Sequence, residues 1–200
     1  MSDPQAAPDP RAEFRAYLAT AVMRLAPRSR QLMIVGVITI VLGMVVIAIV
    51  TQSRVLSLIP AGILMAIAAV LELGIGHNAR GDDTRTTPWA RAGLLHAAAA
   101  GFAVLSPFLP LPIFSGFIGL MMLAAGIVHL RTDFALPISR QSAIMPMASI
   151  VTTLIGLLIL TQWPGDNRQV LGVLIGIDLI VRGWGWIGFG VTLRKAMNRR

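Results

Sequence analysis

The sequence contains no cysteine, which excludes disulfides, thiolate catalysis and cysteine-held zinc or iron–sulfur centres. Charged residues are scarce, at 13%, whereas hydrophobic residues make up 56% of the 200 positions. Walker-type loops, HExxH, GxSxG and the dinucleotide-binding glycine fingerprint are also missing. We therefore expect no enzyme, no cofactor and no catalytic residue. The mean hydropathy of +0.75 indicates a membrane protein instead.

Six apolar stretches are long enough, at about 20 residues each, to cross a bilayer as helices. They cover about residues 32–51, 56–76, 89–108, 112–130, 143–163 and 169–193. Short turns follow the first, third and fifth stretches, and longer polar loops follow the second and fourth. We predict an all-α polytopic membrane protein with six transmembrane helices, paired into three hairpins.

The three predicted hairpins look related to one another. The second helix of each begins with a small residue or leucine followed by glycine, and another glycine follows 10 to 12 residues on. The glycine pairs are Gly62 and Gly74, Gly116 and Gly126, and Gly172 and Gly183. This pattern indicates an internal threefold duplication, and the general use of glycine in membrane helices is the alternative explanation.

Lysine and arginine concentrate on one side of the predicted bundle. Fourteen lie in, or within a few residues of, the N-terminal segment, the two longer loops and the C-terminal tail, whereas the short turns hold two. Because cytoplasmic loops carry the excess of basic residues, both termini are predicted to be cytoplasmic. This topology accounts for the net charge of +8 and the pI near 11.7, so we expect no nucleic-acid partner.

The start of the chain differs from the rest. Residues 1–10 contain three prolines and two aspartates and are expected to be disordered. Over 11–30, apolar residues at helical spacing alternate with arginines, which predicts an amphipathic helix lying either on an anionic membrane surface or on the protein's own loops. We divide the chain into this N-terminal segment (1–30), a six-helix transmembrane domain (31–195) and a basic tail (196–200).

The last apolar segment carries an acid and a base near its middle. Asp178 and Arg182 are four apart, so they share a helix face in the better order for an ion pair. Each charge costs roughly 2.5–3.5 kcal/mol at the centre of a spanning helix, so this helix is expected inside a bundle. A glycine stripe on another side of the helix allows close backbone contact. Its members are Gly172, Gly176, Gly183 and Gly190.

The pair of Asp178 and Arg182 has three interpretations. It is a structural clamp that fixes the rotation of the helix, a site that handles protons or other ions, or a contact with another subunit. The sequence lacks the paired interrupted helices that mark many transporter sites, which counts against the second interpretation.

A second polar pair is expected near the cytoplasmic ends of two spans. Glu72 and His96 would sit at similar depth, where a bond between them would suit a pH sensor. The simpler alternative is that Glu72 snorkels to the interface and His96 makes an ordinary interhelical hydrogen bond. The three histidines have no ligand spacing in the sequence and predict no metal site. Asp133 falls in a polar loop, and Trp89 is expected as an interfacial anchor.

Residues 171–179, LGVLIGIDL, resemble the leucine- and glycine-rich run of the HdeD family of small bacterial membrane proteins, which is linked to acid resistance. The six spans, internal termini and a turn containing Trp163-Pro164 fit the same pattern, and the resemblance covers roughly residues 30–195. Asp178 corresponds to the family's acidic position, whereas Arg182 is not carried over as a family feature. The family has no established catalytic residues to transfer.

The resemblance implies a multi-pass protein of the bacterial cytoplasmic membrane with a non-enzymatic role in acid or stress tolerance, acting through helix packing and interaction. Membrane lipids are the expected partners, and a homo-oligomer or another membrane-protein partner is left open. One alternative is a small channel or proton-linked transporter that uses Asp178 and Arg182. Another is an accessory subunit of a larger membrane complex.

Overall fold

A computed structural model describes residues 9–52, 58–136, 144–163 and 167–198. These residues form helices and their connections, without a β-strand among them. The elements are α1 (Pro10–Leu25), η1 (Ala26–Arg28), α2 (Ser29–Gln52), α3 (Ile59–Arg80), α4 (Pro88–Val104), η2 (Ser106–Phe108), α5 (Leu111–Ala135), α6 (Ile144–Leu160) and α7 (Arg168–Met197). The expectation of an all-helical chain is confirmed for the described part.

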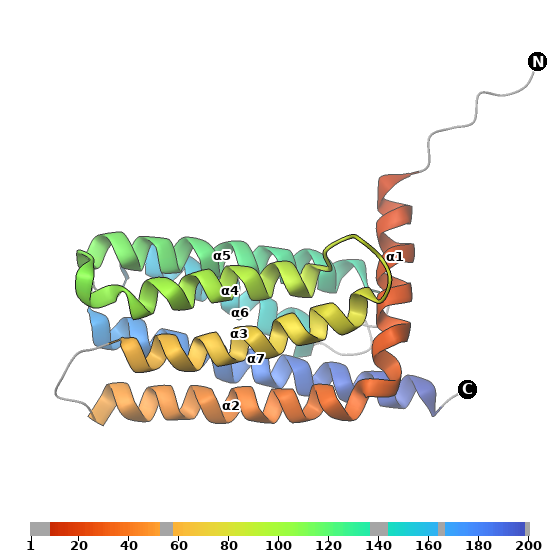
Figure 1. Cartoon of the computed structure of the whole chain (residues 1–200), viewed down its shortest axis with the longest axis horizontal. Helices are drawn as coiled ribbons and strands as arrows, with labels where there is room; N and C mark the ends of the chain where they lie inside the picture. The colour runs from red at the N-terminus through yellow and green to blue at the C-terminus, as the bar shows by residue number, and fades with distance from the viewer. Residues whose placement is uncertain (1–8, 53–57, 137–143, 164–166, 199–200) are drawn as a thin grey trace, which may run out of the picture.

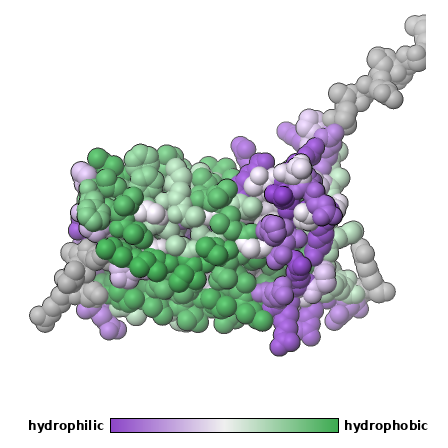
Figure 2. Space-filling view, viewed as in Figure 1, coloured by the Kyte–Doolittle hydropathy of each residue, from purple (hydrophilic) through white to green (hydrophobic). Residues whose placement is uncertain are grey.

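Helices α2 to α7 lie side by side in one bundle, and α1 lies across one end of it (Figure 1). We call this the α1 end; the α3–α4 connection and the end of α7 also lie there. Figure 2 shows that the visible side of the bundle is apolar and that the hydrophilic residues gather at the α1 end. Such a distribution is compatible with a protein that crosses a bilayer, whose interior offers no water to polar groups.

Four segments of the described chain are long and apolar enough to cross a membrane. They are Pro10–Gln52, which contains α2, and helices α3, α5 and α7. Helix α6 is also apolar but has 17 residues, and α4 has 17 as well. Apolar side chains face outwards on these helices; on α2, for example, Val37 is 52% exposed and Met44 is 51% exposed. Such outward apolar faces are compatible with an integral membrane protein.

Helix α1 packs on the protein's own bundle. Leu18, Ala21 and Leu25 are buried in an apolar cluster with residues of α3, α4 and α7. The guanidinium of Arg24 donates a hydrogen bond to the carbonyl oxygen of Arg80, at the last residue of α3. The segment was predicted to lie either on a membrane surface or on the protein itself, and the structure shows contact with the protein itself.

The six bundle helices form a closed ring in which the first and last are neighbours. The most extensive contacts join α2 with α7, α3 with α4, and α5 with α6. The contacts of α4 with α5, α6 with α7, and α2 with α3 are less extensive and complete the ring. The hairpins predicted from sequence, such as α2 with α3, are thus not the most tightly packed units.

The glycine stripe of α7 lies against α2. A Cβ atom added at Gly183 would lie 2.5 Å from the carbonyl oxygen of Gly36, and one at Gly176 would lie 2.5 Å from Cγ1 of Ile47. A Cβ atom added at Gly172 or Gly190, the outer members of the stripe, would likewise press on Val50 or Ser29 of α2. These contacts let the two backbones approach more closely than any larger residue would allow.

Equivalent close contacts recur at the other two tight interfaces. A Cβ atom added at Gly62 of α3 would press on the carbonyl of Ala100 on α4. In the same way, one at Gly119 of α5 would press on the carbonyl of Gly156 on α6, and one at Gly176 of α7 on that of Gly43 on α2. Gly62, Gly119 and Gly176 are equally spaced along the chain. The spacings between their partners, Gly43, Ala100 and Gly156, differ from each other by one residue. The contacts therefore relate Gly62 to Gly119 and Gly176, whereas the sequence alignment had related it to Gly116 and Gly172.

Several helices end at different residues from those predicted. Helices α3 and α5 continue to Arg80 and Ala135, so the predicted polar loops begin later than expected. Helix α4 stops at Val104, shortly before Pro107, because a proline has no N–H to donate to the carbonyl four residues earlier and its ring clashes with that carbonyl. Helix α7 reaches Met197, so the predicted tail starts within it. Most of the segment predicted to be disordered, and Pro164, lie outside the described residues.

We predict that Gly183→Ala destabilises the bundle by about 1–3 kcal/mol, the usual cost of overpacking a well-filled interior. The added methyl group would press on the backbone of α2, which cannot turn aside as a side chain can. The measurement is the free energy of unfolding in detergent micelles. The control is Gly101→Ala, where nothing lies within 4 Å of the added carbon. Equal stability of both variants would contradict the proposed close packing.

Candidate functional site

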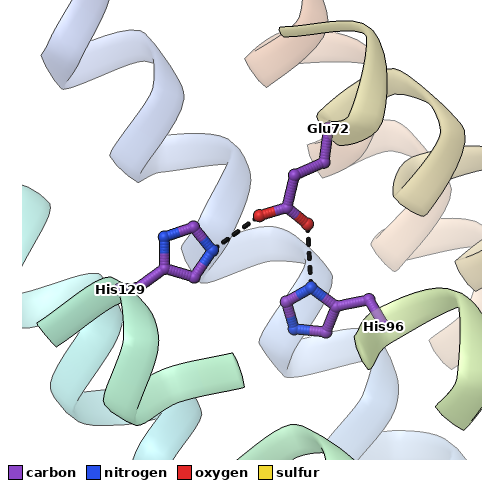
Figure 3. A group of neighbouring side chains, drawn as sticks. All are labelled: Glu72, His96 and His129. Carbon is purple, nitrogen blue, oxygen red and sulfur yellow. Dashed lines mark hydrogen bonds and ion pairs between the residues drawn. The ribbon is translucent and has the colours of Figure 1, made fainter. Parts of the chain in front are cut away.

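The candidate site is centred on Glu72, which is 2% exposed in the middle of α3. Histidines from two other helices bond its carboxylate (Figure 3). Nδ1 of His96 on α4 is 2.8 Å from Oε2, and Nε2 of His129 on α5 is 2.6 Å from Oε1. The carboxylate thus accepts one bond on each oxygen from a separate helix.

Arg182 of α7 joins this centre to Asp178. Its Nη1 is 3.3 Å from Oε2 of Glu72, and its Nη2 is 2.7 Å from Oδ2 of Asp178. The other oxygen of Asp178 accepts a hydrogen bond from the hydroxyl of Thr152 on α6, at 2.7 Å. The two pairs expected from sequence, Glu72 with His96 and Asp178 with Arg182, are therefore parts of one assembly. We call these six residues, including His129 and Thr152, the charge network.

Asp133 lies next to the charge network, one helical turn after His129 on α5. Its side chain is 3% exposed and accepts a hydrogen bond from the hydroxyl of Ser149 on α6. The prediction that Asp133 falls in a loop is wrong, because α5 runs beyond it. A third acid is thus held inside the bundle.

Two sequence interpretations of single residues are corrected by the structure. Glu72 does not snorkel to the interface, because it is buried and bonded on both oxygens. Trp89 is 1% exposed and stacks on Phe189 with ring centroids 6.0 Å apart, so it is not an interfacial anchor. Both side chains belong to the interior at the α1 end.

Sequence reasoning missed His129, which it did not connect with Glu72 or His96. Its place in the internal repeat offered a signal, since Glu72, His129 and Trp186 are equally spaced along the chain. The structure brings these three together, and the rings of His129 and Trp186 meet edge to face with centroids 6.5 Å apart. The repeat therefore places chemically different residues around one centre.

The charge network and Asp133 hold three acidic and three basic side chains. With all three carboxyl groups ionised and both histidines neutral, the acids exceed the bases by two charges. Protonation of both histidines removes this excess. Because uncompensated charge is costly away from water, the protonation of these groups is coupled to the stability of the bundle. Nη2 of Arg182 and Oδ2 of Asp178 form an ion pair with each other, whereas Nε2 of His96 and Nε of Arg182 are buried without a hydrogen-bond partner.

A small cavity of about 40 Å³ borders the charge network. His129, Asp133, Thr152 and Arg182 are among the residues that line it. This volume is sufficient for more than one water molecule, since a single water needs about 10–15 Å³ measured in this way. Towards the opposite end of the bundle the interior is an apolar cluster. Its members include Phe114, Ile118, Met122, Ile155 and Ile175.

Glu72, His96 and His129 have the composition of a metal site. One ligand atom from each lies within 4.8 Å of the others, and imidazole with carboxylate suits several transition metals. Two of the three histidines, which show no ligand spacing in the sequence, therefore share one site in the structure. The guanidinium of Arg182, in contact with the same carboxylate, opposes a divalent cation by charge repulsion. We therefore favour the proton as the cation that this site binds.

Comparisons of the chain with known protein families, with curated proteins and with solved structures find no match. The chemistry of the site must therefore be inferred from its own geometry.

We predict that Arg182→Met lowers the free energy of unfolding by about 3–5 kcal/mol, the range for breaking a buried ion pair. The variant leaves Glu72 and Asp178 without their shared counter-charge. The control is Arg194→Met, which makes the same chemical change at an exposed position of the same helix. A loss of similar size in both variants would show that Arg182 carries no special role.

Proposed function

We propose that the protein is a six-span helical membrane protein whose charge network holds the bundle together in a proton-dependent way. The function is non-enzymatic and serves acid or stress tolerance, in keeping with the resemblance of residues 171–179 to the HdeD family. The observation that carries the proposal is the convergence of His96, His129 and Arg182, from three helices, on the buried carboxylate of Glu72.

The number of spans is supported by the shared direction of α2 to α7 (Figure 1). An orientation with the α1 end in the cytoplasm is supported by the arginines of α1 and of the last turn of α7, which lie at that end. Both described ends of the chain would then be cytoplasmic. In a bacterium the corresponding location is the cytoplasmic membrane.

Proton dependence is supported by the two histidines, because imidazole has an ordinary pKa of about 6.5 and changes charge near neutral pH. Acidification would convert His129 into a cation facing Glu72, with Asp133 nearby. The net negative charge of the buried site would fall, and the hydrogen bond between Glu72 on α3 and His129 on α5 would become an ion pair. A bundle that tightens in acid suits a protein of acid tolerance.

Proton transport is a second candidate, because the cavity beside Arg182 gives water a place next to the charge network. The apolar cluster between this cavity and the far end of the bundle opposes a continuous wet path. Proton flux into vesicles that is carried by the wild type and lost in Asp178→Asn would favour transport over the clamp.

We predict that the fluorescence of Trp186 falls as the pH is lowered from about 8 to 5. An imidazolium next to an indole quenches it by accepting an electron from the excited ring, and His129 is the neighbouring imidazole. The measurement uses a variant in which the exposed Trp163 and Trp184 are replaced by phenylalanine, so that Trp89 is the only other indole.

The matched variants are His129→Gln and His77→Gln in the same background. His129→Gln is expected to abolish the pH response, whereas His77→Gln, at an exposed position on α3, is expected to retain it. A response that is absent in the parent, or unchanged by His129→Gln, would contradict protonation at the charge network.

A further inference from the structure

A basic groove of about 920 Å³ lies between α1, the start of α4 and the end of α5. Four arginines line it: Arg11 and Arg15 from α1, Arg91 from α4 and Arg131 from α5. All four are exposed, and none takes part in an ion pair within the described ranges. Four cations from three helices therefore face one groove without a bound counter-charge.

Apolar side chains line the same groove as the four arginines. Phe14 is 38% exposed and Phe134 is 69% exposed, and Val128 and Leu130 continue the lining along α5. Exposed aromatic rings beside arginines match the level of a bilayer at which head groups meet acyl chains. A ligand that fits this wall has an anionic end and a hydrocarbon end.

A smaller groove of about 260 Å³ adjoins the first and shares Phe14 and Arg91 with it. Arg85 adds a fifth cation, and Glu13 is the acid in its lining. The hydroxyl of Tyr17, which also lines this groove, is buried without a hydrogen-bond partner. Burial raises the pKa of the Tyr17 phenol, so the hydroxyl keeps its proton and can donate it to an anionic oxygen.

We propose that these two grooves bind the head group of an anionic phospholipid, with the phosphodiester against the arginines and the acyl chains along Phe14 and Phe134. Basic pockets beside transmembrane helices on the cytoplasmic side bind such head groups by the same chemistry. The inference rests on the proposed insertion of the bundle with its α1 end in the cytoplasm. Lipid binding there holds α1 against α4 and α5, above the charge network.

The test measures binding of short-chain phosphatidylglycerol and phosphatidylcholine to the purified full chain in neutral detergent. The site variant is Arg15→Gln with Arg131→Gln. The control is Arg28→Gln with Arg194→Gln, which removes the same charge from exposed arginines that do not line the grooves.

The wild type is expected to prefer phosphatidylglycerol, and the site variant to lose about 30-fold in affinity for it, at about 1 kcal/mol for each arginine. The control variant is expected to change affinity by less than about 3-fold on the same scale. Equal affinity for the two lipids, or equal losses in both variants, would overturn the proposal. Displacement of the lipid by inorganic phosphate alone would assign the site to a free anion instead.

Flotation of all three proteins with lipid vesicles separates this inference from the proposed function. A chain that fails to float with vesicles contradicts membrane insertion itself. A chain that inserts but shows no preference for phosphatidylglycerol contradicts the lipid site alone.

Discussion

The structure depends on the need to balance buried charge where water is scarce. Glu72 and Arg182 lie inside an apolar bundle, and each ion costs several kcal/mol when it is left unpaired in such surroundings. Five helices supply the groups that offset this cost: α3, α4, α5, α6 and α7 each contribute a side chain to the charge network. The network lies between two apolar clusters, one at the α1 end and one at the far end. The relative rotation of the five helices follows from these contacts.

Helix α2 contributes nothing to the charge network yet determines how α7 presents it. The glycine stripe fixes one side of α7 against α2, so Asp178 and Arg182 must point to the interior. Steric and electrostatic constraints thus act on different faces of one helix. Helix α1 closes the end nearest the network, and its arginines form the grooves to which we assign an anionic lipid. The charge network and the grooves to which we assign the lipid are therefore adjacent in the structure.

Periodicity and local spacing predicted the helices, including one in the first segment, and the ion pair of Asp178 with Arg182, because these are properties of neighbouring residues. The contact of Glu72 with His96 followed from their expected depth in two successive spans. The contributions of His129 and Thr152 could not be predicted in that way, since they depend on which helices adjoin in the ring. The close packing of α2 with α7 could not be predicted from local patterns either, because the two helices are far apart in the sequence. The register of the internal repeat, which glycine spacing alone misaligned by a few residues, became evident from the glycine contacts.

The central claim is that the acids of α3 and α7 belong to one network joined by Arg182. A double-mutant cycle with Glu72→Gln and Asp178→Asn tests it most directly, by comparing the free energies of unfolding of the wild type, the two single variants and the double variant. Because both acids share one guanidinium, we expect the effects to be coupled by at least about 1 kcal/mol. Effects that add to within about 0.5 kcal/mol would show two independent sites and contradict the account.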